Sequence, residues 1–127
     1  MRNITLIAGL LIGFFALAQT GPKATFEKKA MQFEDIKEGK TLEFYYYFKN
    51  TGNAPLKLHS VKPTCGCTVA EFPKYEIKPG QRDSIKVSFD TKDRSGYNAK
   101  GVNIVSNAGD INLVFEVNVI PLAGKKE

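Results

Sequence analysis

Three stretches of the chain alternate between apolar and polar residues. In residues 41–50 the side chains that share one face are Leu42, Phe44, Tyr46 and Phe48. Residues 83–90 and 110–119 repeat the period, with Ile85, Val87 and Phe89 in the first and Ile111, Leu113, Phe115, Val117 and Val119 in the second. Because successive side chains of a strand point to opposite faces, this alternation predicts three strands that each bury one face.

Shorter runs and the turns between them extend the all-β pattern. Further strands are predicted at Ala24–Glu27, Gln32–Ile36, Pro55–Val61, Thr68–Phe72 and Val102–Ser106. Gly, Asn or Pro residues mark turns near 37–40, 50–53, 78–80 and 106–110. Short strands with turns about every ten residues predict an immunoglobulin-like antiparallel β-sandwich of seven to eight strands.

The N-terminus has the pattern of a secretory signal. Arg2 precedes an uncharged apolar run, and Ala16 and Ala18 supply a small-x-small cleavage pattern. We expect residues 1–18 to form a signal helix and residues 19–127 to form the domain, which starts at Gln19. The expected location is therefore exported, periplasmic or extracellular, with no stable membrane anchor after cleavage.

Charge along the chain is dispersed. The net charge of +5 comes from 18 basic and 13 acidic residues, and the longest basic runs are pairs. A nucleic-acid-binding protein usually concentrates its positive charge on one face or segment. The dispersed charge therefore argues against a nucleic-acid partner.

Three sequence segments together resemble a bacterial family. They are "FKNTGNAPLKLHSVKPTCGCT", "IKPGQRDSIKVSFDT" and "VNIVSNAGDINLVFEV". The Cys-Gly-Cys-Thr motif at Cys65–Thr68 is similar to the mark of the family called domain of unknown function 1573. The resemblance spans residues 33–119 and implies an exported bacterial domain with a Hydin-like or major-sperm-protein-like immunoglobulin fold. It implies no established activity.

Cys65 and Cys67 are the two cysteines of the chain, with only Gly66 between them. In the chain-entropy account, a disulfide that closes so small a loop stabilises by only about 1.6 kcal/mol, against about 3 kcal/mol for a loop of 15 residues. Three interpretations stay open: a passive turn, a reducible pair for thiol exchange, or soft ligands for Cu(I).

Other candidate residues are few. His59 is the single histidine and is predicted to point outward from its strand, which makes it a weak candidate ligand. Tyr45 and Tyr47 are predicted to face away from the core, where they could contact a partner or a neighbouring strand. No catalytic residues are predicted, because the chain shows no recognisable Ser-His-Asp arrangement.

These observations predict an exported, non-enzymatic domain with a binding or structural role in the bacterial envelope. The expected partner is another envelope protein, and no cofactor is required. The alternative is a periplasmic thiol-redox or Cu(I)-handling protein that uses Cys65 and Cys67.

Overall fold

The computed structural model describes Gly9 and residues 20–123 of the chain. The strands in this part are β1 (Ala24–Phe26), β2 (Ala30–Gln32), β3 (Ile36–Lys37), β4 (Thr41–Asn50), β5 (Leu58–Pro63), β6 (Thr68–Glu71), β7 (Arg82–Asp90), β8 (Gly96–Ser106) and β9 (Gly109–Ile120). Among these residues there is no helix long and apolar enough to cross a membrane. The predicted signal peptide, residues 1–18, lies outside the described residues apart from Gly9.

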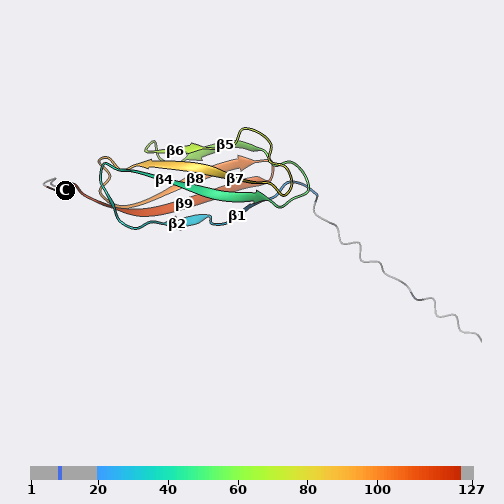
Figure 1. Cartoon of the computed structure of the whole chain (residues 1–127), viewed down its shortest axis with the longest axis horizontal. Coiled ribbons are helices and arrows are strands. Elements are labelled where there is room, and N and C mark those ends of the chain that lie inside the picture. Colours follow the sequence, from blue (N-terminus) through green and yellow to red (C-terminus); the bar gives the residue numbers. More distant parts are fainter. Residues whose placement is uncertain (1–8, 10–19, 124–127) are drawn as a thin grey trace, which may run out of the picture.

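The strands form two sheets that pack face to face as a sandwich (Figure 1). One sheet has the order β1-β4-β7-β6, and the other has the order β2-β9-β8-β5 with β3 also paired to β9. Strands β1 and β2 lie along one edge of the sandwich, and β5 and β6 lie along the other (Figure 1). The all-β sandwich predicted from the sequence is confirmed.

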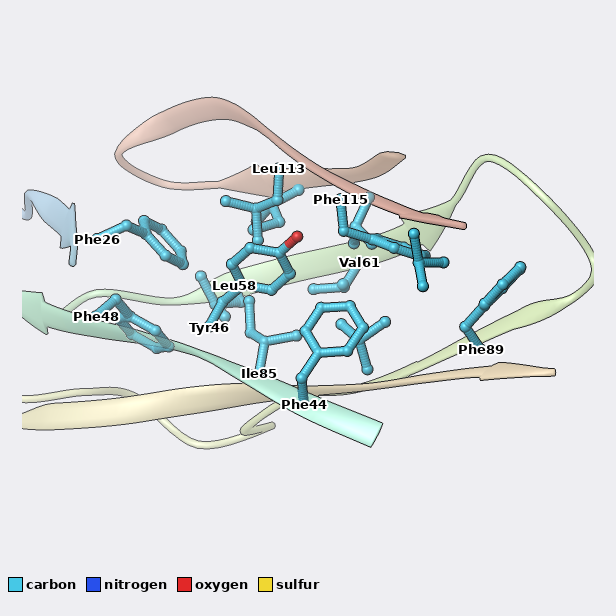
Figure 2. Close-up of a cluster of buried hydrophobic side chains, with 14 of the residues drawn as sticks. Phe26, Phe44, Tyr46, Phe48, Leu58, Val61, Ile85, Phe89, Leu113 and Phe115 are labelled. Carbon is cyan, nitrogen blue, oxygen red and sulfur yellow. The ribbon is translucent and has the colours of Figure 1, made fainter. Parts of the chain in front are cut away.

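The centre of the core is formed by residues that the alternation assigned to the inner faces. Most of the predicted inward residues of the three long strands are buried, and Leu42 and Ile111 are partly buried. The buried ones are Phe44, Tyr46 and Phe48 of β4, Ile85, Val87 and Phe89 of β7, and Leu113, Phe115, Val117 and Val119 of β9. Figure 2 shows these side chains meeting between the sheets. The ring of Phe115 lies 4.9 Å from that of Phe44 and 5.5 Å from that of Phe89, both edge to face. Edge-to-face contacts of this kind are favourable between aromatic rings.

Tyr46 joins the two sheets through its polar end. Its ring is fully buried, and its hydroxyl donates a 2.6 Å hydrogen bond to the backbone carbonyl of Val114 in β9. Burial raises the pKa of the Tyr46 phenol well above its ordinary value, because the charged form is poorly solvated there. The neutral hydroxyl is therefore a permanent donor between the sheets.

The edge formed by β2 and β3 differs from the prediction. The segment Gln32–Ile36 was expected to be one strand, but β2 ends at Gln32 and β3 begins at Ile36. Both strands run parallel to β9, so the second sheet is mixed and the described chain has nine strands. The chain passes from β1 in one sheet to β2 in the other within three residues, and this switch at an edge places β2 beside β9.

Two other strands differ from the prediction by more than one residue at a boundary. Strand β5 spans Leu58–Pro63 rather than Pro55–Val61, because Leu56 forms an isolated bridge with Ile77 instead of joining the strand. Strand β8 begins at Gly96 rather than at Val102, because its first half pairs with the last residues of β9.

Asn50 is a buried polar residue that holds one end of the sandwich together. Its side-chain oxygen accepts hydrogen bonds from the backbone N–H groups of Lys23 (3.3 Å) and Gly52 (3.0 Å). Its amide nitrogen donates to the carbonyl oxygens of Ala54 (2.8 Å) and Ile77 (2.9 Å). A buried amide that is bonded in this way avoids the desolvation penalty and fixes the positions of three separate segments.

Gly52 is required by the close approach of the chain at this end. A Cβ atom on Gly52 would lie 2.2 Å from the carbonyl oxygen of Gly21, which is a backbone atom that cannot swing away. Asn53 closes the same contact, because its side-chain oxygen accepts a 2.6 Å hydrogen bond from the Gly21 N–H. Gly52 and Asn53, which marked a turn in the sequence, therefore also hold the segment at Gly21 against this end of the sandwich.

We expect Phe115→Ala to destabilise the protein by about 3–5 kcal/mol, the usual range for a buried phenylalanine. Phe115 is fully buried, whereas Asn112 of the same strand is exposed, so Asn112→Ala should change stability by less than about 0.5 kcal/mol. Denaturant unfolding of the two variants measures both free energies. Equal losses of unfolding free energy in the two variants would show that Phe115 and Asn112 do not lie on the inner and outer faces of β9 as described.

Candidate functional site

Tyr45 and Tyr47 lie on the outer face of β4, opposite the side that packs into the core. They are 42% and 51% exposed, and their rings stack on one another with centroids 5.9 Å apart. The position of both residues follows from the strand period, since their neighbours Phe44, Tyr46 and Phe48 point inward. The predicted outward orientation of the pair is confirmed.

Tyr75 extends this aromatic surface. It lies in the connection between β6 and β7, is exposed, and donates a hydrogen bond from its hydroxyl to a carboxylate oxygen of Asp83. This hydrogen bond, with smaller effects of desolvation and charge, raises the pKa of the Tyr75 phenol. We call the surface formed by Tyr45, Tyr47 and Tyr75 the tyrosine face. Tyr75 was not predicted, because it belongs to a connection without alternation.

Shallow hollows border the tyrosine face. One of about 230 Å³ lies between β1 and β4 and is lined by Phe26, Tyr47 and Arg82, among others. A second of about 230 Å³ touches both Tyr45 and Tyr47, and a third of about 420 Å³ lies between Tyr45 and Tyr75. The stacked rings therefore project between recesses that a partner's side chains can enter.

The charges around the tyrosine face are mixed. Lys86 forms a 3.9 Å ion pair with Glu43, and Arg82 forms a 3.7 Å ion pair with Glu27. Exposed pairs of this kind stabilise the fold little. They leave the surface with donors and acceptors of both signs rather than with a single-sign field.

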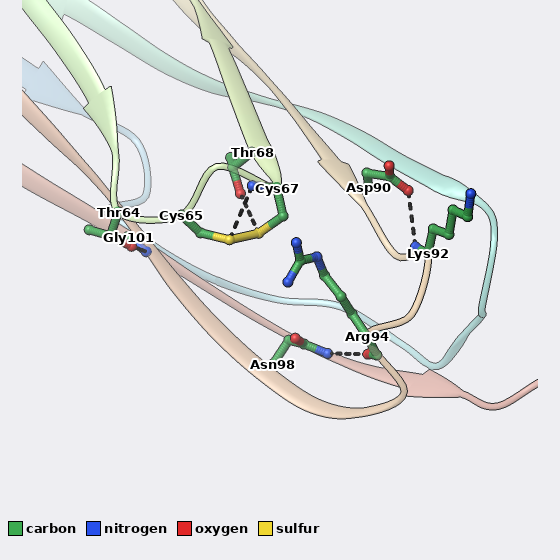
Figure 3. The surroundings of a disulfide bond; sticks show 9 residues. All are labelled: Thr64, Cys65, Cys67, Thr68, Asp90, Lys92, Arg94, Asn98 and Gly101. Atoms are coloured by element: carbon green, nitrogen blue, oxygen red, sulfur yellow. Dashed lines mark hydrogen bonds between the residues drawn. A yellow bond between two sulfur atoms is a disulfide. The ribbon is translucent and has the colours of Figure 1, made fainter. Parts of the chain in front are cut away.

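The two cysteines lie where the chain crosses from β5 in one sheet to β6 in the other. Cys65 and Cys67 form a disulfide with a Cα–Cα distance of 5.2 Å, within the usual range for this bond. The Cys67 N–H donates a 3.1 Å hydrogen bond to Sγ of Cys65, and the Thr68 N–H donates to the Cys65 carbonyl. Figure 3 shows this turn from the side.

The end of β7 and the loop after it lie next to the cysteine turn. The Asp90 N–H, at the end of β7, donates a 3.0 Å hydrogen bond to the Cys67 carbonyl. The loop that follows carries Arg94, whose side chain points toward the disulfide in Figure 3. Asn98 donates a 2.8 Å hydrogen bond to the Arg94 carbonyl and holds that loop in place. The sequence does not reveal that Arg94 points toward the cysteines, because it lies 27 positions after Cys67 in the chain.

His59 does not join the cysteines. It is exposed near the start of β5, at the opposite end of that strand from the cysteine turn. In the part of the chain that the structure describes, no three His, Cys, Asp or Glu side chains converge on a metal position. A disulfide sulfur is not a thiolate, so Cu(I) binding would require the reduced pair.

The described residues form a small β-sandwich domain with a disulfide in the connection between β5 and β6. The chain belongs to the family described as "Protein of unknown function (DUF1573)", whose model matches residues 24–119. No curated protein matches the chain.

Several solved structures share the fold. A protein of unknown function from Porphyromonas gingivalis W83 has a TM-score of 0.71 and 21% identity, over 84% of this chain and 51% of that one. PapD-like domain 7 of human CEP192 has a TM-score of 0.61 and 14% identity, over 90% and 97% of the two chains. The secreted serine protease VesC from Vibrio cholerae has a TM-score of 0.56 and 13% identity, over 80% and 23%.

These similarities support the immunoglobulin-like sandwich and show the fold alone. The chain spans about half the length of the Porphyromonas protein and about a quarter of VesC.

We expect the double variant Cys65→Ser, Cys67→Ser to unfold within about 1.5 kcal/mol of the parent, because a three-residue loop restricts the unfolded chain so little. Urea unfolding of the variant and of the parent with and without a reductant measures this difference. A loss of about 2–5 kcal/mol, as for an ordinary structural disulfide, would contradict the expectation.

Proposed function

We propose that this chain is an exported, non-enzymatic immunoglobulin-like domain that binds another protein of the bacterial envelope through the tyrosine face. The observation that carries the proposal is the exposed, stacked pair Tyr45 and Tyr47, with Tyr75 lining the same hollow as Tyr45.

The stacked pair suits a protein contact. Tyrosine is enriched at protein interfaces, because its ring supplies apolar area and its hydroxyl supplies a hydrogen bond. Stacking already restricts the rings of Tyr45 and Tyr47, so binding would order them at little further entropic cost.

The two hollows beside Tyr47 favour a polypeptide over a small molecule. They are each about 230 Å³, below the range of about 300–1,000 Å³ that is usual for small-molecule pockets, whereas the hollow of about 420 Å³ between Tyr45 and Tyr75 lies within that range. Recesses of that size fit single side chains of a partner. The mixed charges of Lys86, Glu43, Arg82 and Glu27 suit the polar rim of a protein interface.

Export is supported by the predicted signal peptide and by the Cys65–Cys67 disulfide, since disulfides persist mainly in oxidising compartments. The non-enzymatic part of the proposal is supported by the position of His59, the only histidine, which lies exposed and apart from the cysteine turn.

The variant Tyr45→Ala, Tyr47→Ala should fold and should bind its envelope partner at least about tenfold more weakly, since central tyrosines commonly contribute 2 kcal/mol or more. Tyr97→Ala is the matched control, because Tyr97 is 67% exposed on β8 in the other sheet. Affinity capture from solubilised envelopes identifies the partner, and titration with that purified partner measures the affinities.

If the double variant and the parent bind the partner equally, the tyrosine face is not the binding surface. Equal weakening by Tyr97→Ala would also contradict the proposal, because the effect would not depend on the sheet that carries the tyrosines.

A further inference from the structure

We propose that the Cys65–Cys67 disulfide is a thiol–disulfide exchange site, in which Cys65 is the sulfur that forms the mixed disulfide with an exported thiol. This inference goes beyond the proposed binding role and does not depend on the tyrosine face.

The two cysteines differ in burial. Cys67 is 7% exposed and belongs to the buried core cluster, whereas Cys65 is only partly buried at the rim of that cluster. Gly66, between them, is exposed, and a Cβ atom added there would meet nothing within 4 Å. Cys65 is therefore the less buried of the two cysteines, and an incoming thiolate meets less protein there than at Cys67.

The surroundings of the disulfide suit a thiolate. The Cys67 N–H already donates to Sγ of Cys65 at 3.1 Å, and an N–H donor stabilises a negative sulfur. The charged residues drawn around the disulfide in Figure 3 are Asp90, Lys92 and Arg94, and of these Arg94 points toward the sulfurs. The Asp90 carboxylate instead accepts a 3.0 Å hydrogen bond from the Lys92 N–H. A cation beside a cysteine favours its thiolate form.

The backbone holds the turn in place on both sides. On the β5 side, the Thr64 N–H donates a 2.9 Å hydrogen bond to the carbonyl oxygen of Gly101 in β8. The Gly101 N–H donates a 3.0 Å hydrogen bond to the hydroxyl oxygen of Thr64. On the β6 side, the Asp90 N–H binds the Cys67 carbonyl. Reduction therefore leaves the two thiols near each other, and the pair can close again.

The exchange balances as follows. A thiolate of an exported dithiol protein attacks Sγ of Cys65, which forms a mixed disulfide and releases the Cys67 thiolate, which takes up a proton. The partner's second thiol loses its proton and attacks the partner sulfur of the mixed disulfide. This step releases Cys65 as a thiolate, which takes up a proton to become a thiol. The partner loses two electrons and becomes a disulfide, and this chain gains them as a dithiol. Each molecule of this protein accepts one electron pair and oxidises one partner, so the reaction is stoichiometric rather than catalytic.

The direct test uses oxidised glutathione and the two single-cysteine variants. With Cys67→Ser the remaining Cys65 should form a mixed disulfide with glutathione at least about tenfold faster than Cys67 does in Cys65→Ser, because access and thiolate character control this reaction. Mass spectrometry follows the adduct, and circular dichroism shows that both variants fold. Equal rates, or a faster reaction at Cys67, would overturn the assignment.

Arg94→Gln in the Cys67→Ser background tests the cation. Loss of the cation should raise the pKa of Cys65, so that less of it is a thiolate at neutral pH. Because a thiolate of higher pKa is also more nucleophilic, the rate at neutral pH should fall only roughly threefold. The pH at which the rate is half-maximal should rise. Lys92→Gln is the control, because it removes the same charge from the same loop and should leave the rate and the pH profile unchanged. A purely structural role of Arg94 would leave the pH profile in place and would overturn its part in the site.

The unsubstituted protein gives an independent measurement. In reduced glutathione the disulfide should open, and fragmentation of the trapped peptide on either side of Gly66 should place the adduct on Cys65. A disulfide that stays closed, or an adduct on Cys67, would overturn the proposal even if a variant failed to fold.

Discussion

The period of two in β4 is the constraint on which the rest of the molecule depends. Phe44, Tyr46 and Phe48 point into the sandwich, so Tyr45 and Tyr47 must point out of it. One strand thus supplies the centre of the core and the surface that we propose for binding. A slip of one residue in its pairing with β7 would exchange the two sets, and this keeps the register well defined.

The two proposed sites are separate products of the same sandwich. The tyrosine face lies on the outer surface of one sheet, whereas the Cys65–Cys67 turn lies where the chain crosses between the sheets. The tyrosine face depends on the alternation of side chains along β4. The cysteine turn depends on the contacts between loops at the end of β5. Binding and thiol exchange can therefore be altered independently by substitution.

The sequence predicts local features of this protein well and long-range contacts poorly. Alternation suffices to orient Tyr45 and Tyr47, because successive residues of one strand point to opposite faces of the sheet. The parallel pairing of β2 with β9 joins residues more than 80 positions apart, and no local pattern specifies it. Asn50 was interpreted as a turn residue, yet its buried side chain bonds segments near residues 23 and 77. The orientation of the Arg94 side chain toward the cysteine turn likewise follows only from the packed fold.

Hydroxyl-radical footprinting of the tyrosines tests the central claim most directly, because Tyr45, Tyr46 and Tyr47 are consecutive and differ mainly in facing. In the folded protein, Tyr45 and Tyr47 should be oxidised at least about tenfold faster than Tyr46, which becomes reactive only on unfolding. Oxidation of Tyr46 in the folded protein at the rate of its two neighbours would contradict the account, since one strand could not then supply both the core and the outer surface.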